Sequence, residues 1–131
     1  MSAGTEITVL ALGGLLLAVQ FGLMAVPANL QLGPRATMGP RDEPLQLTGI
    51  AGRLHRALGN MTEALVLYGA AAVSVTLSDA GSAFTATCAW VWLAARVVYV
   101  PCYAFGLSPW RSLCFAIGFA AAVLMLIAAL V

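Results

Sequence analysis

Two arginines, an asparagine and a glutamate stand at the start of an otherwise apolar stretch of the chain. They are Arg53, Arg56, Asn60 and Glu63, and no lysine occurs anywhere in the sequence. At about 100° per residue, these four positions fall within about 80° of one helix face. Guanidinium groups bind carboxylates through paired hydrogen bonds, so this first stripe suits an anionic ligand that carries carboxylates.

A second polar stripe lies further along the chain, at Arg96, Tyr99 and Tyr103. These positions lie within about 60° of each other on one helix face. At about 1.5 Å per residue from the turn that joins the two helices, Glu63 is about 21 Å deep and Arg96 about 18 Å deep. The stripes are therefore level. We expect Arg96 to reach Glu63 and the tyrosines to face the other polar residues of the first stripe.

A structural role is the first alternative for these stripes. Arg96 and Glu63 could neutralise each other and hold two helices together, and Arg53 and Arg56 could extend to lipid headgroups. However, three arginines against one carboxylate leave a surplus of two positive charges. A structural network would balance its charges, so the surplus favours an anionic ligand.

The composition predicts an integral membrane protein. Of 131 residues, 62% are hydrophobic and 8% charged, and the mean hydropathy is +0.97. A soluble domain carries about 25% charged residues.

The net charge of +1 argues against a nucleic-acid partner. The single histidine has no cysteine or second histidine at metal-ligand spacing, so we expect no metal. The three cysteines are expected to be apolar core residues rather than disulfides.

Four apolar segments are long enough to cross a bilayer of about 30 Å. We expect one domain, residues 1–131, folded as an all-α, integral membrane, antiparallel four-helix bundle. The first apolar run is expected to be retained as a span rather than removed as a signal peptide. It should end at Pro27 and Asn29, before a loop at residues 31–46. The predicted spans are approximately 7–27, 48–77, 84–105 and 110–131.

The arginines also predict an orientation. All of them except Arg96 lie in the first and third connections or at the polar starts of the spans that follow. By the positive-inside rule, both termini should face away from the cytoplasm. The absence of lysine and the abundance of alanine suggest a bacterial source, and hence a multi-pass protein of the inner membrane.

Tryptophans and glycines support simpler expectations. Trp90, Trp92 and Trp110 are expected to face lipid or the membrane interface. Gly13, Gly14 and Gly69 are expected to allow helices to pack closely.

In the residues of both stripes, the chain resembles the MAPEG family (membrane-associated proteins in eicosanoid and glutathione metabolism). The pattern Arg53-x-x-Arg56-x-x-x-Asn60-x-x-Glu63 is similar to the family's glutathione signature on its second helix. The pattern Arg96-x-x-Tyr99-x-x-x-Tyr103 is similar to the counterpart on its third helix. The resemblance covers nearly the whole chain, and the run Gly39-Pro40-Arg41-Asp42 is similar to the loop of prokaryotic-type members.

The resemblance implies a homotrimer that binds glutathione between neighbouring subunits, in a site open to the cytoplasm. It also implies that an arginine near the start of the fourth helix activates the thiol, and Arg111 is the candidate. Eukaryotic members often carry a tyrosine after the signature glutamate, where this chain has Ala64. The implied glutathione-binding residues are Arg53, Arg56, Asn60, Glu63 and Arg96, with Tyr99 and Tyr103 contributed by the next subunit.

The implied activity is that of a membrane glutathione transferase. Glutathione would be the co-substrate, and its thiolate would attack a lipophilic electrophile dissolved in the bilayer. Peroxidase or isomerase activity would use the same thiolate. Two other classes stay open: a non-catalytic glutathione-binding, lipid-binding or scaffold protein, and a small transporter. Polar residues confined to one side of the membrane argue against the transporter.

Overall fold

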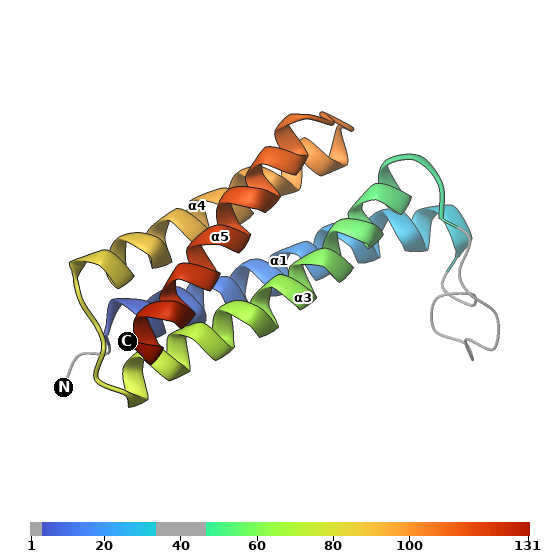
Figure 1. Cartoon of the computed structure of the whole chain (residues 1–131). Coiled ribbons are helices and arrows are strands. Elements are labelled where there is room, and N and C mark those ends of the chain that lie inside the picture. The colour runs from blue at the N-terminus through green and yellow to red at the C-terminus, as the bar shows by residue number, and fades with distance from the viewer. Residues whose placement is uncertain (1–3, 34–46) are drawn as a thin grey trace.

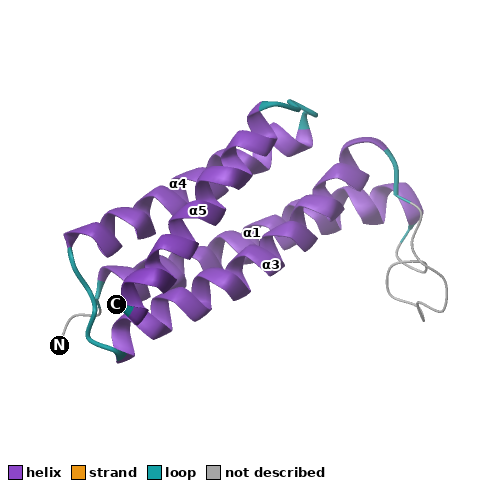
Figure 2. Ribbon diagram, viewed as in Figure 1, coloured by secondary structure: helices purple, strands orange, loops and turns teal. Residues whose placement is uncertain are grey.

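The computed structural model describes residues 4–33 and 47–131, which form four helices (Figures 1 and 2). No strand occurs in these ranges. Each helix is long and apolar enough to cross a membrane. The expected all-α, four-helix membrane architecture is therefore confirmed. The helices are α1 (Thr5–Leu32), α3 (Gly49–Leu77), α4 (Ala83–Ala104) and α5 (Trp110–Leu130).

The helices run up and down, so both ends of the chain lie at the same end of the bundle (Figure 1). The most extensive contacts join α4 to α5 and α1 to α3, and the contacts of α3 with α4 and α5 link these two pairs. Within the described residues, no Cα atom of α1 lies within 8 Å of a Cα atom of α5. At the end opposite the termini, the α4–α5 pair diverges from the α1–α3 pair (Figure 1).

The first helix continues through Pro27 to Leu32, so the prediction that it ends at Pro27 and Asn29 is wrong. A proline inside a helix removes one backbone hydrogen bond. Here the side-chain amide of Asn29 donates to the Ala25 carbonyl at 2.8 Å, which supports the following turn. The helix ends instead at Gly33, whose φ of 85° is readily adopted only by glycine.

The ends of the first connection are tied together. The Gln31 side chain accepts a hydrogen bond from the Thr48 N–H at 2.9 Å and donates to the Thr48 carbonyl at 3.2 Å. Residues 34–46, which include Arg35 and Arg41 and most of the predicted loop, lie outside the described residues.

The middle of the bundle is built around an aromatic pair. Tyr68 of α3 stacks on Trp92 of α4 with ring centroids 4.2 Å apart, and its hydroxyl donates to the Glu6 carbonyl at 2.8 Å. Trp92 is 1% exposed, so the expectation that it faces lipid is wrong. Trp90 and Trp110 are exposed, in agreement with prediction.

Gly13 explains how the indole of Trp92 becomes buried. A Cβ at residue 13 would lie 3.0 Å from the Trp92 ring and 3.0 Å from Leu65 Cδ1. Glycine therefore lets α1 approach closely enough to cover the ring, in agreement with its predicted packing role. Gly14, by contrast, has no neighbouring atom within 4 Å in the described chain.

The cysteines are free thiols. Cys88 and Cys102 are buried and Cys114 is half-buried, in agreement with their predicted place in the core.

Candidate functional site

The two polar stripes meet across the α3–α4 contact. Arg96 Nη1 donates a hydrogen bond to Asn60 Oδ1 at 2.9 Å. The structure therefore joins the stripes as predicted, but through Asn60 rather than Glu63, which lies about one helical turn further along α3. The Glu63 side chain is exposed, and no ion pair is found among the described residues. The stagger between α3 and α4, which helix periodicity does not specify, decides which polar group Arg96 meets.

Arg96 is held on two sides and left unsatisfied on a third. It is 1% exposed, and its Cζ lies 4.1 Å from the centroid of the Tyr99 ring, in cation–π contact. Its Nε and Nη2 atoms are buried and have no hydrogen-bond partner. A buried donor without a partner costs about 1–3 kcal/mol, and more when it is charged. Such donors are therefore expected to meet a ligand or water.

A cavity of about 140 Å³ lies beside Arg96, between α3, α4 and α5. Its polar wall is formed by Arg96, Asn60 and Glu63. The rest of its lining is apolar, aromatic or glycine: Ala64, Leu67, Trp92, Phe115, Gly118 and Phe119. We call this space the inner cavity.

A second cavity, of about 230 Å³, adjoins the first. We call it the outer cavity. Asn60 and Phe115 line both spaces, so the two cavities share a wall. The outer cavity brings Tyr99 of the second stripe and Arg111 of α5 to the Asn60 side chain. It is lined by Asn60, Tyr99, Arg111, Ser112 and Phe115.

Tyr103 positions Arg111. The Cζ atom of Arg111 lies 4.8 Å from the centroid of the Tyr103 ring, and the Tyr103 ring in turn lies 5.5 Å from that of Tyr99. Cation–π contacts of this kind contribute about 0.5–2 kcal/mol. The two tyrosines predicted from the second stripe therefore each support an arginine.

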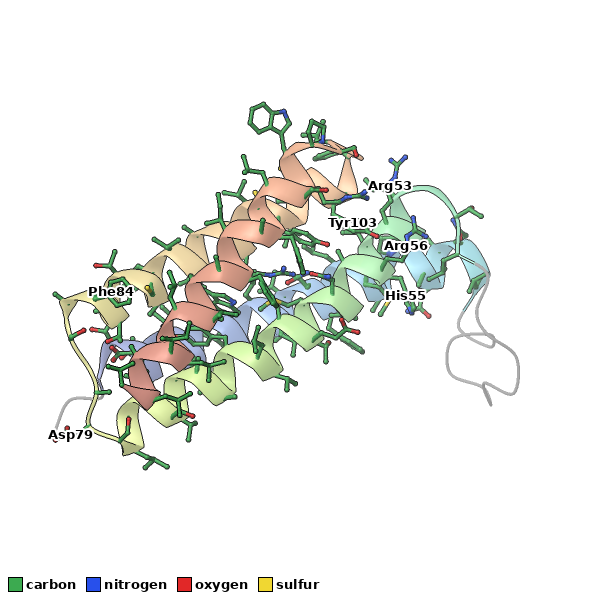
Figure 3. The ribbon with its side chains drawn as sticks, viewed as in Figure 1. Arg53, His55, Arg56, Asp79, Phe84 and Tyr103 are labelled. Atoms are coloured by element: carbon green, nitrogen blue, oxygen red, sulfur yellow. The ribbon has the colours of Figure 1, made fainter. Side chains whose placement is uncertain are left out.

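The remaining arginines of the first stripe lie at its outer end. Arg53, Arg56 and Tyr103 gather at the end of the bundle where the helix pairs diverge, and His55 lies on the other side of α3 (Figure 3). Arg53 and Arg56 are both exposed, and neither lines the two cavities. The structure thus brings together the Asn60, Arg96, Tyr99, Tyr103 and Arg111 side chains. It places Glu63 in the wall of the inner cavity and leaves Arg53 and Arg56 at the rim, outside both cavities.

Arg53 lies against the turn between α4 and α5. A Cβ at Gly106 would be 3.3 Å from Arg53 Cζ, and Gly106 has a φ of 67°. Both the close approach and the left-handed backbone favour glycine at this position. The start of α3 is therefore in contact with the turn that leads into Arg111.

Sequence patterns did not identify the apolar half of the site. The α5 residues Phe115, Gly118 and Phe119 carry no signal, because α5 is apolar on every side and its periodicity does not indicate which face lines a cavity. Trp92 of α4 was misplaced for a different reason, because its burial depends on the close approach of Gly13 from α1.

The site has a strong positive surplus. Within the described residues, the end of the bundle that holds the site carries Arg53, Arg56, Arg96 and Arg111 but only one carboxylate, Glu63. The other described acidic residues, Glu6 and Asp79, lie at the end where the chain termini are found. The described residues therefore carry the predicted positive surplus at this end of the bundle.

Comparison with protein families finds one match that spans nearly the whole chain. The model of the MAPEG family matches residues 9–131, which include both stripes and Arg111. Comparison with curated proteins and with solved structures finds no match. The family match and the four membrane-spanning helices agree with the resemblance seen in the two stripes, and the chain belongs to the MAPEG family.

Proposed function

We propose that the protein is a membrane glutathione transferase, in which the thiolate of glutathione attacks a lipophilic electrophile. The observation that carries this proposal is the pair of adjoining cavities. One is lined by Asn60, Tyr99 and Arg111, and the other is mostly apolar. Membership of the MAPEG family supports a glutathione-related membrane enzyme.

The charges at the rim and in the wall of the inner cavity match the tripeptide. Glutathione has two carboxylates, one ammonium group and a thiol. Arg53 and Arg56 would bind the carboxylates through paired hydrogen bonds, and Glu63 would bind the ammonium group. Asn60 would donate from its amide nitrogen, because its oxygen already accepts the 2.9 Å bond from Arg96.

Arg111 would stabilise the thiolate. A free thiol titrates near pH 8.5, so at neutral pH only about a few per cent is ionised. A guanidinium group beside the sulfur favours the charged form and lowers the pKa of the thiol without a general base. Tyr99 and Tyr103 would complete the site by their hydroxyl groups and by holding the two arginines.

We further propose that the working form is a homotrimer. Arg56 and Glu63 are exposed on α3 in the single chain, and charged side chains at membrane depth normally face protein or a water-filled cavity. A neighbouring subunit would cover this face. Tyr99 lines the same cavity as Asn60 of its own subunit. The neighbouring subunit would therefore cover the exposed Arg56 and Glu63 side chains rather than supply Tyr99 to the site. Light scattering in detergent should give the mass of three chains; a monomer would contradict this proposal.

Glutathione binding tests the proposed site. In detergent, calorimetric titration of the wild-type protein should show saturable binding. Arg56→Ala should raise the Kd about thirtyfold, since removing a charged hydrogen-bonding partner costs about 2 kcal/mol. His55→Ala is the matched control, because His55 is exposed on the other side of the same helix turn.

Two results would change the interpretation. Unaltered affinity in Arg56→Ala would show that the first stripe is not the tripeptide site. Tight binding without turnover of any electrophile would favour the non-catalytic scaffold over the transferase.

A further inference from the structure

We propose that Arg96 binds the oxygen of the electrophile and stabilises the negative charge that develops there during thiolate attack. The inferred substrates are compact α,β-unsaturated carbonyl compounds that occupy the inner cavity. This inference rests on the proposed glutathione chemistry and assigns its second substrate.

The free edge of the Arg96 guanidinium is the first observation. Nε and Nη2 are the two nitrogens left without a partner, while Nη1 is bound to Asn60. In a planar guanidinium, Nε–H and one terminal N–H form a fork that can bind a single oxygen or a pair of oxygens. The Asn60 bond and the Tyr99 ring hold the group in place. These fixed donors in a buried site meet the requirement for oxyanion stabilisation.

The size and lining of the inner cavity are the second observation. Its volume is about 140 Å³, and an apolar cavity of about 150 Å³ accommodates a benzene molecule. Trp92, Phe115 and Phe119 provide an apolar wall for a body of that size. Ala64 and Gly118 have side chains too small to fill the space.

The apolar lining restricts the ligand further. Apart from Arg96, Asn60 and Glu63, the inner cavity is lined by apolar, aromatic or glycine residues. A ligand with a permanent negative charge would have to give up its hydration to enter this space. A neutral carbonyl compound enters without that cost, and its oxygen becomes negative only in the transition state. The arrangement therefore favours the transition state over the bound substrate.

The shared wall of the two cavities places the reacting groups together. The sulfur, held beside Arg111 in the outer cavity, would meet the β-carbon at the border formed by Asn60 and Phe115. The sulfur forms a bond to the β-carbon, the C=C electron pair moves to the adjacent carbon, and the carbonyl pair moves to oxygen. The enolate oxygen is held by Nε–H and Nη2–H of Arg96. Water then protonates the α-carbon, which restores the carbonyl and balances the proton lost by the thiol.

The test compares two electrophiles with the full-length protein in detergent and saturating glutathione. One is 2-cyclohexen-1-one, whose attack produces an enolate. The other is benzyl chloride, whose attack expels chloride and produces no oxyanion. In Arg96→Lys, which keeps the charge but not the fork, the kcat/KM ratio of cyclohexenone to benzyl chloride should fall about 100-fold, as expected for losing an oxyanion-binding donor.

A cavity variant keeps the proposal testable if Arg96→Lys does not fold. A Cβ at Gly118 would lie 3.6 Å from Ala95 Cβ and 3.8 Å from Arg96 Cδ, which is ordinary van der Waals contact. Gly118→Ala should therefore fold while narrowing the inner cavity. It should lower the kcat/KM ratio of cyclohexenone to the smaller methyl vinyl ketone severalfold.

The possible failures are distinguishable. Unchanged ratios in both variants would overturn the role of Arg96 and the inner cavity. Wild-type protein that turns over benzyl chloride but not cyclohexenone would overturn the substrate class and leave the transferase intact. Absence of glutathione binding in the wild-type protein would overturn the proposed function itself.

Discussion

Arg96 of α4 and Arg111 of α5 are the same residue type in different surroundings. Arg96 is buried between Asn60 and the Tyr99 ring and has two unpartnered nitrogens. Arg111 is half-buried, lies over the Tyr103 ring and lines the outer cavity. The first position suits transient charge on a neutral substrate. The second suits a thiolate that forms before attack.

Replacing Arg111 should move the titration of bound glutathione. A nearby positive charge lowers the pKa of a thiol, so in the wild-type protein the thiolate of bound glutathione should persist at neutral pH and be lost as the pH falls. In Arg111→Ala the thiol pKa should return toward about 8.5, and ultraviolet thiolate absorbance should disappear at pH 7. Arg111→Lys, which keeps the charge, should retain most of the signal. An identical titration curve in Arg111→Ala would remove this residue from the mechanism.

The close approach of the helices to one another shapes the candidate site. Gly13 lets α1 cover Trp92, and Trp92 forms part of the inner cavity wall. Gly106 lets Arg53 contact the turn before Arg111. Two glycines therefore support the site from outside it. A methyl group at residue 13 would crowd Trp92, and a methyl group at residue 106 would crowd Arg53 and would also strain a backbone whose φ is 67°.

Gly13→Ala should destabilise the bundle. The added Cβ would lie 3.0 Å from both Trp92 and Leu65, and overpacking of this kind costs about 1–3 kcal/mol. Gly69→Ala is the matched control at the same α1–α3 contact, since its Cβ would lie 3.7 Å from Leu10 Cδ1. Thermal unfolding in detergent should give a lower Tm for Gly13→Ala only. Equal Tm values for the two variants would show that the glycine contact with Trp92 is unimportant.

The whole molecule has its polar site at one end and its termini at the other. The site lies toward the end where the α4–α5 turn is found (Figure 1). Because five of the six arginines lie in the first and third connections or at the starts of the spans that follow them, we propose that this end faces the cytoplasm. Cytosolic glutathione could then reach the rim directly.

Thiol labelling in intact cells tests this orientation. Asp79 lies in the turn at the end with the termini, and Leu107 lies in the α4–α5 turn; both are exposed. A membrane-impermeant maleimide should label Asp79→Cys in intact cells and Leu107→Cys only after permeabilisation. The wild-type protein is the control, because Cys88 and Cys102 are buried and Cys114 is half-buried. The reverse labelling pattern would invert the proposed orientation.

The sequence predicted correctly those properties that depend on a single helix. Hydropathy predicted the four spans, and spacing predicted that the two polar stripes lie level with each other. The same spacing paired Arg96 with Glu63, about one helical turn from the Asn60 side chain that it meets. Prediction from the sequence failed at Pro27, where a side-chain hydrogen bond from Asn29 supports a helix that proline was expected to end. It failed again at Trp92, because burial of that ring depends on the glycine of another helix.

Composition and periodicity by themselves determined that this chain crosses a membrane four times and carries two level polar stripes with a positive surplus. Those properties follow from the chain's own chemistry and from the fixed rise and turn of a helix. Only the tertiary structure decided that Arg96 meets Asn60 instead of Glu63 and that an apolar face of α5 closes a cavity beside it. Stagger and rotation between helices arise from packing many side chains together, and no local pattern in the sequence specifies them.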